Sequence, residues 1–278
     1  SAKRIMAVLN TETSIENHPG NAQTDSGSGE HSVIFEHVDF VYPDGEEAVL
    51  KDISFSAKSG ETVAFIGSTG SGKSSLIQLI PRFYDRASGN IYIDGQKIED
   101  LDINALRSKI GFVPQKAHLF SGTIEENIRF GKPDATMDEI IHAAKIAQAY
   151  DFIMEKPHQF QEQIVEGATN VSGGQKQRLS IARALIRKPE IYIYDDSFSA
   201  LDFKTDARLR KALKPEIKNA IVFLVAQRVS TILDADKIVV LDEGKIAGIG
   251  THRELLASCP IYYEIAASQL SKEELTYA

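Results

Sequence analysis

The sequence lacks a second cysteine, a long apolar run and an excess of basic residues. Its 278 residues include one cysteine, Cys259, which excludes an internal disulfide and fits a reducing compartment. The best apolar run, residues 220–226, falls far short of the ~18 residues that a membrane helix needs. The net charge of −8 would make a nucleic-acid backbone repel the chain. We therefore expect a chain that is soluble by itself and binds no nucleic acid.

The composition and the length indicate one globular unit. Apolar residues make up 42% and charged residues 25%, which allows a sizeable core. A chain of 278 residues suits one α/β unit with an inserted subdomain. The opening residues show no charged-then-apolar secretory leader.

The ends of the chain differ in pattern from the middle. Residues 2–9 place Ile5, Met6 and Leu9 on one face of a short amphipathic helix. The polar stretch after it completes a predicted linker over residues 1–32. Alternation of apolar and polar residues from Val33 predicts the first strand of a folded domain over 33–270, and 271–278 form a tail.

Short apolar runs alternate with helical patterns in the folded part. Runs at 62–66, 191–194, 221–226 and 237–242 predict buried strands separated by helices, and therefore a mostly parallel sheet covered on both faces. Strand patterns are scarce at about 116–188, which predicts an inserted helical subdomain.

A phosphate-binding loop follows the first of these strands. The residues GSTGSGKS match G-x-x-x-x-G-K-[ST], whose glycines let backbone N–H groups converge on an anion at a helix N-terminus. Lys73 would reach the β- and γ-phosphates and Ser74 would hold Mg²⁺. The residues assigned to ATP here are Gly67, Ser68, Thr69, Gly70, Ser71, Gly72, Lys73, Ser74 and Ser75.

Two carboxylates end the apolar strand at 191–194. Asp195 would coordinate Mg²⁺ through water, and Asp196 would point toward the attacking water. Adjacent acids after an apolar strand are also common as solvated strand ends. The phosphate loop upstream favours the catalytic interpretation.

The family resemblance rests on a second glycine-rich segment. VSGGQ, followed by KQR and LSIARAL, resembles the LSGGQ signature of ABC ATPases, with valine in place of leucine. The resemblance implies a P-loop NTPase core with a mostly parallel sheet, an N-terminal antiparallel β subdomain and an inserted α-helical subdomain. It also implies a dimer in which each signature caps the ATP of the partner domain. The signature residues are Val171, Ser172, Gly173, Gly174 and Gln175.

Other segments match the family's motifs in order. By resemblance, Tyr42 stacks on adenine. Gln115 is by resemblance a candidate catalytic residue, together with Asp196 and Gln227, and it contacts Mg²⁺ and senses the membrane domain. The Mg²⁺ ligands implied are Ser74, Gln115 and Asp195. The loop that crosses the dimer interface matches Ser199, Ala200, Leu201 and Asp202.

Two segments resemble exporters in which membrane and ATPase domains share one polypeptide. These are AKRIMAVLN at the start and SGTIEENIRFG after residue 120. We therefore expect a fragment of a longer chain with a transmembrane domain, at the cytoplasmic face of the cell membrane. Multidrug export is the family's common assignment.

The catalytic positions depart from the family. The family has glutamate where this chain has Asp196, and histidine where it has Gln227. Aspartate is one methylene shorter, and a misplacement of ~1 Å can cost about 10²-fold in rate. Glutamine can donate a hydrogen bond but cannot titrate. The intact signature would then serve a different partner subunit, as in heterodimeric exporters with one degenerate site.

Two alternatives remain open from the sequence. One is a homodimeric exporter whose aspartate is an active base. The other is an ABC ATPase without a membrane partner, although such proteins usually carry two cassettes or a long coiled coil, and neither appears here. The segment VEGAT also departs from the usual exporter pattern before the signature.

Overall fold

The computed structural model describes residues 2–10, 15, 17, 31–271 and 275. Most of the linker predicted over 1–32 and of the tail predicted over 271–278 therefore lies outside the described residues. Helix α1 (Ala2–Leu9) forms where the apolar spacing predicts it, and it exposes Ile5, Met6 and Leu9. Among the described helices, none has the length and apolar character needed to span a bilayer.

A six-stranded sheet forms the centre of the molecule, in the order β12-β11-β3-β10-β9-β6. All its neighbours run parallel except β12, which pairs antiparallel with β11. The predicted mostly parallel sheet is confirmed. Its strands are β3 (Thr62–Gly67), β6 (Ile110–Val113), β9 (Ile191–Asp195), β10 (Ile221–Val225), β11 (Lys237–Asp242) and β12 (Lys245–Gly250).

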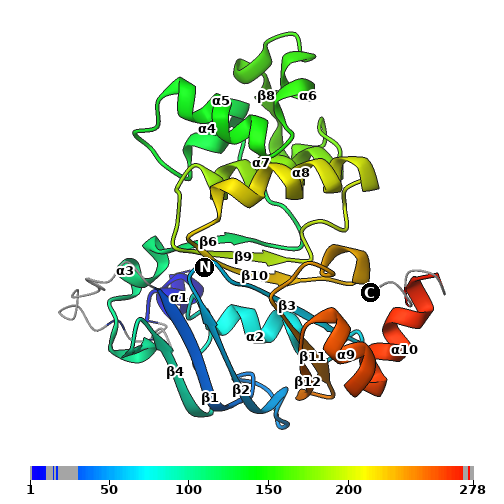
Figure 1. Ribbon diagram of the computed structural model, residues 1–278. Coiled ribbons are helices and arrows are strands. Elements are labelled where there is room, and N and C mark those ends of the chain that lie inside the picture. The colour runs from blue at the N-terminus through cyan, green and yellow to red at the C-terminus, as the bar shows by residue number, and fades with distance from the viewer. Residues whose placement is uncertain (1, 11–14, 16, 18–30, 272–274, 276–278) are drawn as a thin grey trace.

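Both faces of this sheet are buried, because alternate side chains enter two different cores. In β3, Val63 and Phe65 pack on one side with helix α2 (Lys73–Leu79). Ala64 and Ile66 pack on the other, with α7 (Gly173–Leu185) and α8 (Phe203–Glu216). Figure 1 shows α2 and α7 on opposite faces of the sheet.

A second sheet covers α2 from the outside, as the predicted antiparallel β subdomain. Its order is β2-β1-β4-β5, and every pairing in it is antiparallel. Alternating burial along the first strand puts its apolar side chains into the core that α2 shares. The elements are β1 (Ser32–Phe40), β2 (Leu50–Lys58), β4 (Ser88–Ile93), β5 (Gln96–Lys97) and, following them, α3 (Ile103–Ser108).

The segment between β6 and β9 is mainly helical and stands above the sheet (Figure 1). Threonines cap two of its helices, each in a capping box with a glutamate three residues on. A short antiparallel pair, β7 with β8, lies within this segment and brackets α4, α5 and α6. The elements are β7 (Gly122–Thr123), α4 (Ile124–Arg129), α5 (Met137–Ile146), α6 (Tyr150–Met154) and β8 (Gln163–Ile164), and the chain finishes with α9 (His252–Ser258) and α10 (Pro260–Gln269).

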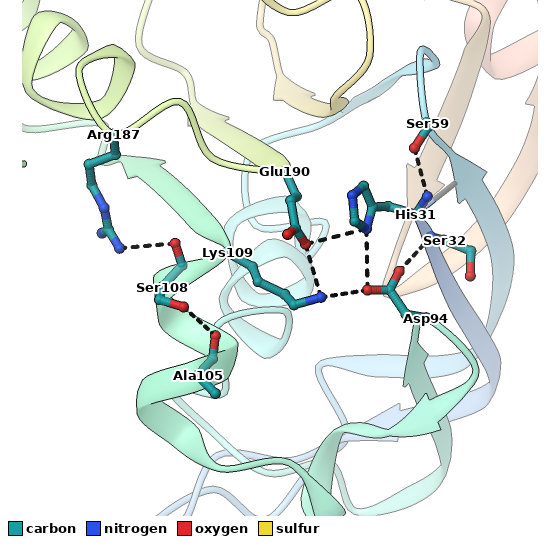
Figure 2. Close-up of polar contacts among 9 residues, drawn as sticks. All are labelled: His31, Ser32, Ser59, Asp94, Ala105, Ser108, Lys109, Arg187 and Glu190. Carbon is teal, nitrogen blue, oxygen red and sulfur yellow. Dashed lines mark hydrogen bonds and ion pairs between the residues drawn. The ribbon is translucent and has the colours of Figure 1, made fainter. Parts of the chain in front are cut away.

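A cluster of ion pairs ties the antiparallel sheet to the central one (Figure 2). The Lys109 ammonium lies 2.7 Å from Asp94 Oδ2 and 3.0 Å from Glu190 Oε2. His31 Nδ1 lies 3.3 Å from each of the same two oxygens. Lys109 and Asp94 are almost fully buried, so the cluster is a structural junction between β1, β4, β6 and β9.

Candidate functional site

The phosphate loop lies between β3 and α2, where the motif predicts it. Gly72 precedes α2 with a φ of 96°, and a Cβ there would lie 2.6 Å from Leu50 Cδ2. A Cβ on Gly67 would lie 2.0 Å from the Leu241 carbonyl oxygen. Both positions therefore require glycine. Residues 68–70 at the tip of the loop are exposed, which leaves it open to an anion.

The Lys73 ammonium lies within this loop. It donates hydrogen bonds to the carbonyl oxygens of Gly67 (3.0 Å) and Ser68 (2.7 Å). Burial lowers the pKa of Lys73, while the charges of Asp196 and Asp195 oppose that effect. The positive charge is thus held where phosphate oxygens would enter.

The two carboxylates lie beside the start of α2. Ser74 Oγ donates to Asp195 Oδ1 over 2.8 Å. Burial raises the pKa of Asp195, as does the charge of Asp196, whereas the hydrogen bond from Ser74 lowers it. A hydroxyl and a carboxylate oxygen are the ligand type that Mg²⁺ prefers. The donor set therefore fits the ion that accompanies ATP.

Two amides hold the second carboxylate. Gln115 Nε2, from the segment after β6, donates to Asp196 Oδ2 over 3.1 Å. Gln227 Nε2, after β10, donates to the same oxygen over 2.7 Å. Burial raises the pKa of Asp196, and hydrogen bonds, first that from Gln115, oppose the rise. All three candidate catalytic residues therefore meet at one oxygen atom.

Tyr42 lies next to the phosphate-loop helix. Its hydroxyl is 2.9 Å from Ser75 Oγ. Its ring packs edge-on against Phe40 and Tyr84, with centroids 4.7 and 5.1 Å away. These contacts fix the ring at the border of the loop, on the β-subdomain side.

The signature begins α7 on the other side of the sheet. Ser172 caps the helix in a capping box with Gln175, and Ser172 and Gly173 are exposed. Val171 is instead buried in the core. A Cβ on Gly174 would lie 3.1 Å from the Ala200 carbonyl oxygen, so the signature adjoins the segment 199–202.

That adjoining segment leads into α8. Leu201 is buried, and the Asp202 side chain caps α8 by accepting from Thr205 N over 2.9 Å. Ser199 and Ala200 are exposed beside the signature. The exposed residues of the two segments thus adjoin one another, whereas Val171 and Leu201 are buried.

Several residues that support the site were not predicted. Gln177 Nε2 donates to the Pro114 carbonyl over 3.1 Å, which links α7 to the segment carrying Gln115. The buried hydroxyl of Ser197 donates to the Val113 carbonyl over 2.9 Å. Ser197 directly follows the two carboxylates, and that adjacency is the one sequence signal that could have drawn attention to it.

Comparisons with known proteins place this arrangement in a family. The family model described as ABC transporter matches residues 50–199. An uncharacterized ABC transporter ATP-binding protein of Bacillus subtilis (strain 168) is 46% identical over 98% of this chain and 47% of its own length. A putative multidrug export ATP-binding/permease protein of Staphylococcus aureus (strain NCTC 8325 / PS 47) is 45% identical over 95% of this chain and 46% of its own.

A solved structure gives the same result in three dimensions. The structure of a bacterial Atm1-family ABC exporter with ATP bound superposes with a TM-score of 0.90 at 34% identity. The matched region covers 97% of this chain and 47% of the exporter chain. The chain therefore spans about half the length of the relatives it matches.

Proposed function

The chain belongs to the ABC transporter family as an ATP-binding domain, and from that premise we propose that it powers an exporter by closing with a second such domain around two ATP molecules. The observation that carries this proposal is the junction of Ser74 with Asp195, 2.8 Å apart, at the start of the phosphate-loop helix. It joins the two halves of an Mg²⁺-nucleotide site. The relatives named as exporters support the transport role.

Within the site, each group has a separate role. The loop N–H groups and Lys73 bind the β- and γ-phosphates, and Tyr42 stacks on the adenine. Ser74, Asp195 and Gln115 would hold Mg²⁺, which when bound would supply positive charge to the phosphate oxygens. Asp196 orients the attacking water.

The geometry around Asp196 supports slow hydrolysis at this site. Its Oδ2 already accepts from the amides of Gln115 and Gln227, at 3.1 and 2.7 Å. Because both amides donate to this one oxygen, they compete with the attacking water for its lone pairs. Gln227 itself cannot carry a proton. The chain would therefore hold ATP longer than it hydrolyses it.

The signature supports a role for a partner. Ser172 and Gly173 are exposed at a helix N-terminus on the opposite face of the sheet from α2 (Figure 1). A helix N-terminus favours an anion, and this one would take the γ-phosphate held by the other domain. We propose a different subunit as that partner, with a histidine, a catalytic glutamate and a damaged signature.

A transmembrane domain of the same polypeptide would dock on the helical segment, at the cytoplasmic face of the membrane. Phe120 and Phe130 are 50% and 64% exposed, and the Arg183 guanidinium lies over both rings. A cavity of about 210 Å³ opens beside them. Exposed aromatic side chains around a hollow suit a protein partner that buries them.

The test replaces Asp196 with Glu and Gln227 with His, singly and together, in the full transporter. Single-turnover hydrolysis at this site should rise by about 10²-fold in the double variant, because the longer carboxylate regains its reach. Lys73→Gln in the same background is the control for hydrolysis at this site. Unchanged turnover would refute the slow site. Hydrolysis by the isolated native chain at ~1–10² s⁻¹ would favour an active homodimer instead.

A further inference from the structure

We propose that a cavity beneath α8 binds a small aromatic carboxylate, separately from the ATP site. The cavity measures about 140 Å³, close to the ~150 Å³ that accommodates one benzene ring. Val222 and Leu224 of β10 and Leu213 of α8 line it. Figure 1 shows α8 lying across the sheet above β9 and β10. The size and the apolar walls therefore select a single ring rather than a nucleotide.

The wall of the cavity carries a buried hydroxyl to which a ligand would hydrogen-bond. Tyr194 lines the cavity and is 1% exposed, and its hydroxyl has no hydrogen-bond partner in the part of the chain that the structure describes. Buried polar atoms are almost always hydrogen-bonded. An oxygen carried by the ligand would complete this one.

Aromatic rings stiffen the same wall. The Tyr194 ring is tilted against Phe198, with centroids 5.2 Å apart, and stacks parallel to Tyr192 at 6.1 Å. Phe198 also lines the cavity. Rings that are already held in place favour an aromatic ligand, because little side-chain freedom is lost on binding.

The rim offers one exposed cation to a negative group on the ligand. Arg210 and Lys214 stand one helical turn apart on α8, and the exposed acid Asp234 faces them. Asp206 already pairs with Arg210, 3.1 Å away. Arg210 is thus already paired, and Lys214 is the exposed cation of the lining that a carboxylate would meet. A ligand with a phenol at its inner end and a carboxylate at its outer end matches both features.

The probe is 4-hydroxybenzoate, compared with benzoate, added to this chain and followed by saturation-transfer NMR with and without ATP. With about ten heavy atoms, a dissociation constant of about 1 mM or below is expected. Benzoate should bind about five- to tenfold more weakly, because it lacks the oxygen that meets Tyr194. ATP should not displace either probe.

Matched variants locate the binding. Tyr194→Phe should weaken 4-hydroxybenzoate about five- to tenfold, leave benzoate unchanged and raise the Tm of the free protein, since it removes an unpaired hydroxyl. Lys214→Gln should weaken both probes, whereas Lys211→Gln on the same helix should weaken neither. The proposal is overturned by no binding at 10 mM, by displacement with ATP, by indifference to Tyr194→Phe, or by a lower Tm in that variant.

Discussion

Replacing Lys109 with methionine should destabilise the domain through the ion cluster of Figure 2. Removing one partner of a buried ion pair costs about 3–5 kcal/mol. Asp94 keeps two other donors, Ser32 N at 3.0 Å and His31 at 3.3 Å. Glu190 is 36% exposed and regains water. The free energy of unfolding should therefore fall by the lower end of that range, about 3 kcal/mol.

The loss of stability in Lys109→Met should depend on pH, because Asp94 titrates. Burial alone would raise the pKa of Asp94, but the hydrogen bond and charge of Lys109 and the Ser32 amide outweigh it, so the pKa is lowered from 3.8. A carboxyl whose pKa is lower in the folded state stabilises the fold above pH 3.8, and this contribution disappears as the pH falls through the folded value. In Lys109→Met, Asp94 lacks its lysine partner, so protonation of its carboxyl at low pH removes the buried negative charge and with it the destabilisation.

Urea denaturation followed by far-UV circular dichroism measures both effects. The difference between native protein and Lys109→Met should be largest at pH 7 and should narrow as the pH falls below 4. Lys97→Met, at an exposed lysine of β5, is the matched control and should change stability little. Adding Asp94→Asn to Lys109→Met should recover part of the loss. A difference below about 1 kcal/mol at pH 7, or one that persists at pH 3, would refute the reasoning.

Three further perturbations have defined outcomes. Gly67→Ala should abolish ATP binding and lower the Tm, because its Cβ would meet the Leu241 carbonyl at 2.0 Å; normal nucleotide affinity by calorimetry would contradict this. Lys73→Gln should weaken MgATP binding about 10- to 100-fold, the value of one charged hydrogen bond, measured by the same titration. Burial lowers the pKa of His252 from 6.5, so stability should decline as the pH falls below 6.5. His252→Phe should remove that decline while losing about 1 kcal/mol at pH 8 with the Tyr262 hydrogen bond, and an unchanged slope in denaturation would count against it.

The sequence predicts the central features of the fold because they are local. A glycine-rich loop after an apolar strand, and two acids at the end of another, identify positions at one edge of a parallel sheet. The structure places Ser74 and Asp195 in contact there. The apolar spacing over residues 136–149 predicts one helix, but α5 is shorter, Met137–Ile146, since Gln148 adopts a φ of 57° and ends it.

Contacts between distant segments could not be predicted. The pair of β7 with β8 contains two residues on each side, too few for a period of two to show. The convergence of Gln115 and Gln227 on Asp196 spans 81 and 31 residues. It depends on how β6, β9 and β10 lie side by side, which the strand order fixes and the motifs do not state.

The capping box at the start of α7 has a consequence for how two domains meet. Ser172 Oγ accepts from Gln175 N, and the Gln175 side chain accepts from Ser172 N, so this turn is ordered before any partner arrives. The turn at Ser172–Gln175 therefore loses its conformational entropy when the single chain folds. If the proposed second domain associates at this turn, the association resembles the docking of two rigid bodies. Ser172→Gly would shift that entropic cost to the association step, so it would weaken the complex while leaving the isolated chain's own ATP affinity intact.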